Sequence, residues 1–203
     1  ISNLETAKNL VVATSIEDLV KSLRSPQIVW VMVTAGEATE NILQELLKYV
    51  QADDVIIDGG NSHYKDTQRR SNNLSTKGVR FLGIGVSGGI VASTQGYPLM
   101  VGGDKNAYEQ VRPVLDSLAK PHGGHEYFGE GGAGHFVKMI HNGIEYGIMQ
   151  SLGEGFDVLT NAPYRFDLLN IARLWQKGTL ISGFMLDRTL DVLSQPSILS
   201  SIE

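Results

Sequence analysis

The sequence predicts an α/β fold in which a parallel-sheet domain is followed by an all-helical domain. Up to about residue 129, short apolar runs rich in β-branched residues alternate with segments of helical periodicity, which is typical of βαβ units in a parallel sheet. Beyond the glycine-rich segment 129–134, only helical periodicity continues. The length of 203 residues is enough for one medium-sized domain and part of a second. We therefore expect two domains, at 1–131 and 132–203.

Each expected element follows from its local pattern. The strands are short apolar runs bounded by glycine or polar residues: IVWVMV (28–33), VIIDGG (55–60), VRFLGIGV (79–86), YPLMVGG (97–103) and, at the sheet edge, HEYFG (125–129). Helices are expected in the intervals and throughout the second half: 38–50, 65–78, 104–119, 134–161, 166–176 and 179–194. The last helix should end before Pro196, because proline disrupts helices.

Composition narrows the class of protein. The net charge of −5 gives no general attraction to nucleic acid or anionic lipid, and no apolar run approaches the length of a membrane span. The absence of cysteine removes disulfides, thiolate zinc sites and a cysteine nucleophile, and fits a reducing compartment. We expect a cytoplasmic protein that binds neither nucleic acid nor membrane and needs no metal. The first residues, ISNLETAKNL, suggest a piece excised from a longer protein.

One glycine motif imitates a cofactor-binding fingerprint. Residues Gly129 to Gly134 read G-x-G-x-x-G, and Glu154 follows 20 residues later. In a dinucleotide-binding fold, however, the acidic residue ends the second strand, whereas Glu154 belongs to the same helix that the glycines open. We interpret this segment as a flexible connector between domains. The 27 residues before the strand at 28–33 contain no such fingerprint, so the phosphate loop of a dinucleotide site is not found in this sequence.

The segment GHFVKMIHNGIEYG (134–147) carries the main candidate site. At 100° per residue, Lys138, His141, Asn142, Glu145 and Tyr146 share an arc of about 140°, with apolar side chains on the opposite side. The alternative is a solvated face of an amphipathic helix. Histidine, asparagine and tyrosine together favour a hydrogen-bonding site instead, in which the lysine and the glutamate act as base and acid on a small polar substrate.

Three loops at expected strand ends are candidates to face that helix. VTAG (33–36), GGNS (59–62) and SGG (87–89) each follow a strand, and ligands collect at the carboxyl ends of parallel strands. Adjacent glycines expose backbone N–H groups that hold carboxylate or phosphate, and Asn61 and Ser87 add side-chain hydrogen bonds. Ordinary turn chemistry is the alternative for each loop alone.

These motifs together resemble the decarboxylating 6-phosphogluconate dehydrogenases. The carriers of the resemblance are VTAG, DGGNSHYKDTQRR, GVSGG and GAGHFVKMIHNGIEYG, and the similarity extends from about residue 10 to 190. The spacing from Lys138 to Trp175 is similar to the shorter, often NAD-preferring branch of the family. The resemblance implies a partial Rossmann-like domain, then a helical domain for substrate and dimerisation. It also implies oxidative decarboxylation of 6-phosphogluconate to ribulose 5-phosphate with NAD or NADP, in the pentose phosphate pathway and gluconate metabolism.

The resemblance also implies residue roles. Lys138 would be the general base and later the acid at the C3 oxygen, a role that requires a neutral lysine, and Glu145 would protonate the enediol. The substrate-binding residues implied are Asn61, Ser87, Gly88, Gly89, His141, Asn142 and Tyr146. The cofactor-binding residues implied are Val33, Thr34, Ala35 and Asn61. No metal is needed, because the protonated lysine can polarise the ketone that loses CO₂.

The sequence departs from the family pattern at one position that matters for the substrate. Ser182 stands where an arginine usually grips the substrate phosphate, although Arg188 is nearby. The alternatives are therefore a β-hydroxyacid dehydrogenase acting on another sugar acid or 3-hydroxy acid, or a non-catalytic truncated homologue. We expect this chain alone to be inactive. Trp175, Phe184, Met185 and Leu186 predict a homo-oligomer interface, with burial inside one chain as the alternative.

Overall fold

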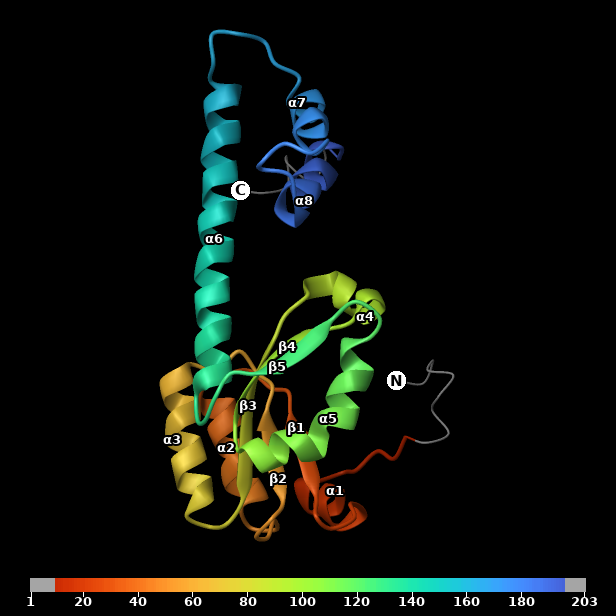
Figure 1. The fold of residues 1–203 in the computed structure, drawn as a ribbon, viewed down its shortest axis with the longest axis vertical. Helices are drawn as coiled ribbons and strands as arrows, with labels where there is room; N and C mark the ends of the chain where they lie inside the picture. The colour runs from red at the N-terminus through yellow and green to blue at the C-terminus, as the bar shows by residue number, and fades with distance from the viewer. Residues whose placement is uncertain (1–9, 196–203) are drawn as a thin grey trace. The chain divides into compact units, whose positions relative to one another are not determined.

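The computed structural model describes residues 10–195, which separate into two compact units (Figure 1). The first unit extends to Ile140 and the second begins at His141. Helix α6 (Ala133–Thr160) contributes residues to both units. The domain boundary expected between residues 131 and 132 stays a prediction.

The first unit is built on a five-stranded sheet in the order β1-β2-β3-β4-β5. The strands are β1 (Ile28–Val31), β2 (Val55–Asp58), β3 (Arg80–Val86), β4 (Pro98–Gly103) and β5 (Gly124–Tyr127). All neighbouring pairs are parallel except β3 and β4, which are antiparallel. We expected a parallel sheet, and the observed sheet is mostly but not wholly parallel. The short connection 87–97 explains the difference, because a parallel crossover usually needs a longer helical segment.

Helices cover the two faces of this sheet and create two cores. Helix α5 (Lys105–Ala119) packs its buried residues against one face, with Ile57, Leu82 and Val101. Helices α1 (Ile16–Ser22), α2 (Glu37–Leu46) and α3 (Tyr64–Ser75) pack on the other. Successive β2 residues alternate between the two cores, so the whole run is buried, as its continuous apolar sequence predicted.

Three short helical segments were not expected, and one helix begins later than expected. Helix α1 has only two turns and begins where the Ser15 hydroxyl accepts a hydrogen bond from the Asp18 N–H. A 3₁₀ turn, η2 (Gly89–Val91), and α4 (Ala92–Gln95) form the β3–β4 connection. In the second unit, α8 (Phe184–Leu193) begins later than residue 179, because the chain first forms a turn in which the Ser182 N–H donates to the Thr179 carbonyl at 3.0 Å.

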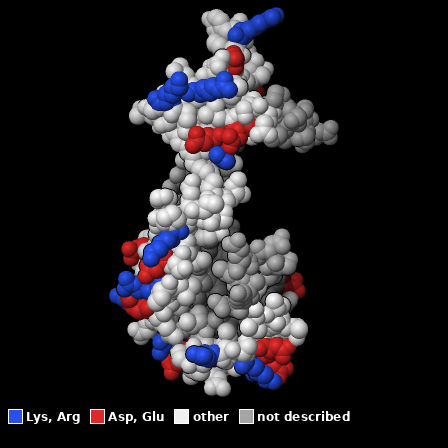
Figure 2. All heavy atoms as spheres, turned by 90° about the vertical axis from the view of Figure 1, so that its right-hand side faces the viewer, with Lys and Arg blue, Asp and Glu red and all other residues white. Residues whose placement is uncertain are grey.

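Charged side chains are distributed over the described surface in small groups of mixed sign. On the face drawn in Figure 2, lysine and arginine atoms lie beside aspartate and glutamate atoms. Ion pairs such as Arg69–Glu40, Arg112–Glu109 and Arg188–Asp191 account for this mixing. Within residues 10–195, no helix is long and apolar enough to cross a membrane.

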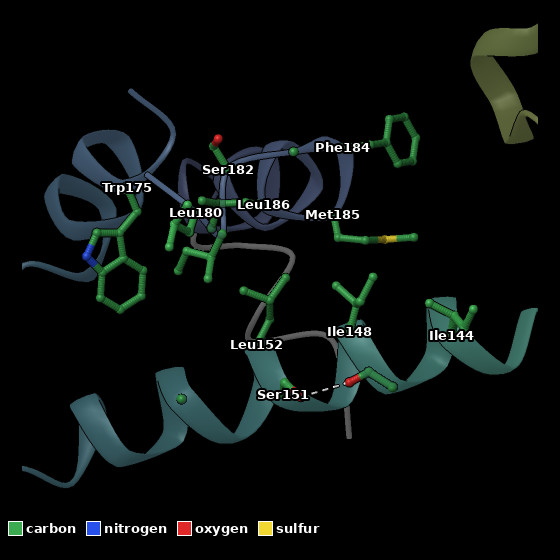
Figure 3. Close-up of a pocket in the computed structure, with 14 residues that line it drawn as sticks. Ile144, Ile148, Ser151, Leu152, Trp175, Leu180, Ser182, Phe184, Met185 and Leu186 are labelled. Carbon is green, nitrogen blue, oxygen red and sulfur yellow. Dashed lines mark hydrogen bonds between the residues drawn. The ribbon is translucent and has the colours of Figure 1, made fainter. Parts of the chain in front are cut away.

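The second unit contains the remainder of α6 together with α7 (Leu168–Trp175) and α8. An apolar groove of about 820 Å³ lies between them, with Ile148 and Leu152 of α6 directed toward Leu180 and Met185 (Figure 3). Trp175 meets Phe156 of α6 edge-on, with ring centroids 5.6 Å apart. This unit therefore has an open apolar face.

Backbone glycines of the sheet determine how α6 begins in the first unit. A side chain at Gly134 would meet the Gly83 carbonyl oxygen at 2.5 Å and the Gly102 nitrogen at 2.6 Å, so the helix start lies directly on β3 and β4. Side chains at Gly83 and Gly85 would clash with Thr67 and Lys138. The glycine-rich segment 129–134 is thus closely packed, with Gly132 N–H donating to Gln68, and the expectation of a flexible connector is wrong.

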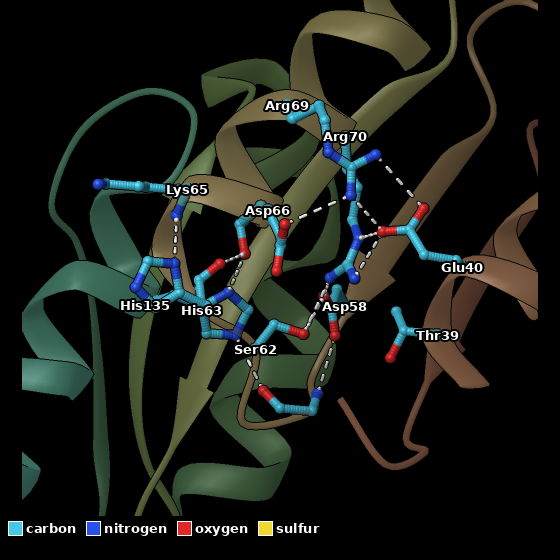
Figure 4. A network of polar contacts seen from close by, with 12 residues as sticks. Thr39, Glu40, Asp58, Ser62, His63, Lys65, Asp66, Arg69, Arg70 and His135 are labelled. Atoms are coloured by element: carbon cyan, nitrogen blue, oxygen red, sulfur yellow. Dashed lines mark hydrogen bonds and ion pairs between the residues drawn. The ribbon is translucent and has the colours of Figure 1, made fainter. Parts of the chain in front are cut away.

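A buried ion pair fixes the turn after β2 (Figure 4). The Asp58 carboxylate accepts hydrogen bonds from Arg70 at 2.8 Å, from the Ser62 hydroxyl at 2.7 Å and from the Gly60 N–H at 3.0 Å. The Arg70 guanidinium also donates to Glu40 of α2 at 2.9 Å. Asp58 and Arg70 are both almost fully buried. The charges are therefore compensated only by each other and by this network.

His135, on the first turn of α6, connects the helix to the same turn. Its ring is 1% exposed, with Nδ1 2.7 Å from the Thr67 hydroxyl and Nε2 3.0 Å from the Gly60 carbonyl oxygen. Since a carbonyl only accepts, Nε2 carries the proton and Nδ1 accepts from Thr67. Burial is the main cause that lowers the pKa of His135, and the positive charge of Arg70 lowers it further. The negative charge of Asp58 raises this pKa and so opposes part of the shift.

We predict that Asp58→Ala destabilises the first unit by roughly 3–5 kcal/mol, because it leaves the Arg70 charge buried without its partner. Chemical denaturation followed by circular dichroism measures the change. The control is Glu109→Ala, which removes the carboxylate of an exposed ion pair to Arg112 and should cost less than about 1 kcal/mol. Equal losses for the two variants would contradict the prediction.

We also predict a pH dependence of stability that originates at His135. Because its pKa is lowered in the folded protein, unfolding takes up a proton below the unfolded value of about 6.5. This contribution to stability is complete above that pH and is lost as the pH falls below it. Denaturation midpoints of the wild type and His135→Gln, compared from about pH 8 to 5, should converge toward acid pH. Parallel pH profiles would refute the assignment.

Candidate functional site

The loops after β1 and β2 lie against each other at the carboxyl edge of the sheet. A side chain at Gly60 would meet the Val33 carbonyl oxygen at 2.8 Å, which shows how closely the two turns approach. The Thr39 hydroxyl donates to the Thr34 carbonyl at 3.0 Å and holds the first loop to the start of α2. Val33, Thr34, Ala35 and Asn61 are exposed beside this contact. This edge can therefore present backbone and amide groups to a ligand.

The loop after β3 meets the lysine of α6. Lys138 Nζ donates a hydrogen bond to the Ser87 hydroxyl at 3.0 Å, and Lys138 is 8% exposed. Ser87 is itself held by its N–H, which donates to the Pro98 carbonyl at 2.9 Å. Gly88 and Gly89 follow with φ of +106° and +54°, conformations that favour glycine. The loop that contacts the buried lysine through Ser87 thus continues into two adjacent glycines.

Contacts within the first unit link these predicted residues into one region. Lys138 contacts Ser87, and His135, three residues earlier on α6, contacts Gly60, which precedes Asn61. Gly60 in turn lies against Val33. The three strand-end loops and the start of α6 are therefore held together, as the sequence predicted.

The remaining predicted residues lie on the part of α6 that belongs to the second unit. His141 Nδ1 is 3.2 Å from the Asn142 side-chain oxygen and 3.6 Å from the Glu145 carboxylate. His141, Asn142 and Glu145 are partly buried, whereas Tyr146 is 67% exposed. Three of these side chains form a local polar cluster along one side of the helix.

Apolar side chains of α6 are exposed to solvent, while its lysine is buried. Phe136, Ile140, Ile144 and Ile148 are between 43% and 62% exposed, while Lys138 is buried. A solvated polar face with an apolar face in the core would show the reverse. The interpretation of α6 as an ordinary amphipathic helix is therefore wrong at its lysine.

The position of Ser182 bears on phosphate binding. Its hydroxyl donates to the Thr179 carbonyl at 2.7 Å and points away from α6 in Figure 3. Arg188 pairs with Asp191 at 3.0 Å and lies 5.2 Å from the Phe184 ring centroid.

Of the apolar residues expected at an interface, Leu186 is buried within the chain, Phe184 is exposed, and Trp175 and Met185 are half-buried.

Sequence reasoning missed the residues that support this region. Asp58, Thr67, Arg70 and His135 belong to the quoted motifs, yet nothing in the sequence distinguished them from surface polar residues. No spacing pattern links them in the sequence, because the partners come from different elements of the fold. Within residues 10–195, no group of three or more histidine, aspartate or glutamate residues is arranged to hold a metal ion.

Comparison with known proteins gives consistent relatives. Residues 3–132 match the family model of the NAD binding domain of 6-phosphogluconate dehydrogenase, and residues 134–201 match that of the 6-phosphogluconate dehydrogenase C-terminal domain. The NAD(+)-dependent decarboxylating enzyme of Haloferax volcanii is 41% identical over 175 residues, which are 86% of this chain and 58% of that protein. The NADP(+)-dependent enzyme of Bacillus subtilis is 42% identical over 193 residues, 93% of this chain and 41% of that protein.

Solved structures agree with these relatives. The 6-phosphogluconate dehydrogenase of Plasmodium falciparum superposes with a TM-score of 0.83 at 32% identity, over 95% of this chain and 42% of that one. The 3-hydroxyisobutyrate dehydrogenase of Mycobacterium tuberculosis has a TM-score of 0.62 at 22% identity, over 75% of this chain and 51% of that one, and shows the fold alone. The chain spans about half the length of the relatives it matches. With its sheet, its motifs and these matches, the chain belongs to the 6-phosphogluconate dehydrogenase family.

Proposed function

We propose that the protein containing this chain oxidises and decarboxylates 6-phosphogluconate to ribulose 5-phosphate and CO₂ with NAD or NADP. The observation that carries the proposal is the buried Lys138, held 3.0 Å from Ser87 beside a glycine loop, in a chain of this family. The proposed role requires Lys138 to be neutral at the moment when it accepts the proton. A neutral amine at this place is suited to remove a hydroxyl proton.

The chemistry assigned to Lys138 follows from that placement. A bound nicotinamide cofactor would supply the acceptor for the hydride of C3. The lysine amine removes the proton from the C3 hydroxyl as the C3–O bond becomes a carbonyl. The resulting ammonium then donates a hydrogen bond to the ketone oxygen, which stabilises the electron pair released when the C1–C2 bond breaks and CO₂ leaves. Ser87, by accepting from Nζ, keeps the amine directed at the substrate.

Glu145 is assigned the closing proton transfer. After CO₂ leaves, the enediol needs a proton at the carbon that carried the carboxylate, and a protonated glutamate can donate it. His141, which lies 3.6 Å from this carboxylate, and Asn142 are assigned hydrogen bonds to the sugar hydroxyls. Tyr146, Asn61, Ser87, Gly88 and Gly89 are assigned to the same substrate. Val33, Thr34, Ala35 and Asn61 are assigned to the nicotinamide cofactor.

The assignment of regions and setting is part of the same proposal. Residues 1–131 form part of the dinucleotide-binding domain, and 132–203 form part of the substrate and dimerisation domain. The exposed apolar side chains on α6 support an oligomer, because large apolar areas are usually covered by another surface. The protein would act in the cytoplasm, within the pentose phosphate pathway and gluconate metabolism.

Ser182 supports a second candidate function. Its hydroxyl is used by a backbone carbonyl, and Arg188 is paired with Asp191. Neither group is set up to bind a phosphate bidentately, which favours a sugar acid or 3-hydroxy acid without phosphate. Such an oxidation without carbon–carbon cleavage would reduce the cofactor without releasing CO₂.

We predict that Lys138→Ala in the full-length protein lowers kcat by roughly 10²–10⁴, because the reaction loses its proton acceptor. Cofactor reduction and CO₂ release are measured together, with 6-phosphogluconate and gluconate as substrates. Lys77→Ala, at an exposed position after α3, is the matched control and should retain wild-type activity. Near-normal turnover by Lys138→Ala would contradict the assignment, and reduction without CO₂ would favour the second candidate function.

We predict that the 203-residue chain alone binds NAD and NADP with dissociation constants above about 1 mM. No G-x-G-x-x-G precedes β1, and the similar motif at 129–134 is packed against α3 and the sheet. Fluorescence titration or calorimetry gives the constant, and a micromolar value would require a phosphate site elsewhere in this sequence.

A further inference from the structure

The buried histidine at the start of α6 has no part in the proton transfers assigned above. Its two ring nitrogens contact two different segments, Thr67 of α3 and the Gly60 carbonyl of the turn after β2. An ordinary core position would be filled by an apolar residue, since an imidazole must find partners for both nitrogens. His135 therefore needs an explanation beyond packing.

The Gly60 peptide is held on three sides. Its N–H donates to the Asp58 carboxylate at 3.0 Å, its carbonyl accepts from His135 Nε2 at 3.0 Å, and its Cα lies against the Val33 carbonyl. Asn61, the next residue, is exposed at the ligand edge and has no side-chain hydrogen bond that would hold it there among those recorded for the described residues. Its position follows from the orientation of the Gly60 peptide.

The same helix turn carries the lysine. His135 and Lys138 are three residues apart on α6, on the side that lies against Gly83 and Gly85 of β3. Gly83 and Gly85 are two residues apart on the strand and therefore face the same side of the sheet. Gly83 leaves room for the histidine ring, and Gly85 leaves room for the first carbons of the lysine side chain. Any shift of α6 would move both side chains together, and the His135 contact would transmit it to the Gly60 turn.

We propose that His135 is a positioning residue, whose Nε2–H bond to the Gly60 carbonyl fixes Asn61 relative to Lys138. This inference rests on the proposed function, in which Asn61 contacts both substrate and cofactor and Lys138 removes the proton. The effect is geometric: a displacement of about 1 Å between reacting groups lowers rate by up to about 10²-fold.

Two substitutions test the contacts of the two His135 ring nitrogens one at a time. In His135→Gln, the carboxamide NH₂ reaches approximately the place of Nε2 and can still donate to Gly60. In His135→Asn, the shorter side chain can still meet Thr67 but does not reach Gly60. Both variants lose the ring and its packing, so a merely structural role would affect them alike.

The experiment measures kcat and both KM values in the full-length protein, per folded molecule, with the folded fraction taken from denaturation curves. We expect His135→Asn to lower kcat by about 10- to 100-fold, and His135→Gln to be at least about tenfold more active than His135→Asn. The destabilised control is Leu46→Ala, whose buried side chain lies at the far end of α2 and whose kcat per folded molecule should equal that of the wild type.

The outcomes discriminate clearly. Equal kcat per folded molecule for the Gln and Asn variants overturns the inference. If His135→Asn does not fold, Thr67→Val takes its place, because it removes the other hydrogen bond of the ring, together with the contact of the Thr67 hydroxyl with the His63 carbonyl, and leaves the Gly60 contact. A folded His135→Gln as active as Thr67→Val then supports the inference, and a folded but inactive one overturns it.

If Lys138→Ala stays active, the proposed function fails first. If Lys138→Ala is inactive while His135→Asn behaves as wild type, the positioning role alone fails.

Discussion

The close seating of α6 on the sheet is the constraint on which the candidate site depends. Gly83, Gly85 and Gly102 leave the surface of β3 and β4 without side chains, and Gly134 lets the helix backbone approach it. A larger residue at any of these positions would meet backbone or side-chain atoms. Only at this short separation does Lys138 reach Ser87 and His135 reach Gly60. Glycines, which have no functional side chain, therefore determine where the Lys138 and His135 side chains are placed.

Polar burial beneath the strand ends follows from the same geometry. Within residues 10–195, the turn that carries the exposed Asn61 is not held by apolar packing on its exposed side. It is held from below, by Asp58 on its N–H and by His135 on its carbonyl. Burying the Asp58 charge is unfavourable unless it is paired, and Arg70 pairs it while linking α3 to Glu40 of α2. We infer that this network serves to fix the position of the turn after β2 more than to increase the net stability of the fold.

Much of the fold was accessible from sequence, because strand and helix periodicities are local. The five strands and the long helix appeared within a few residues of their expected bounds, and the family motifs agreed with the comparisons. The antiparallel pairing of β3 and β4 was not accessible, since pairing direction depends on the path of the 87–97 connection. The packing of 129–134 was also missed, because glycine for flexibility and glycine for close approach read alike in sequence. Roles for His135 and Thr67 required knowledge of which polar atoms meet.

The two sides of α6 impose opposite requirements on the rest of the protein. One side carries the buried Lys138 and the partly buried polar cluster of His141, Asn142 and Glu145. The other side leaves Phe136, Ile140, Ile144 and Ile148 substantially exposed, although burial of such side chains is favourable by roughly 1.5–3 kcal/mol each. A surface that covers the apolar side would also restrict the motion of the helix that carries the lysine.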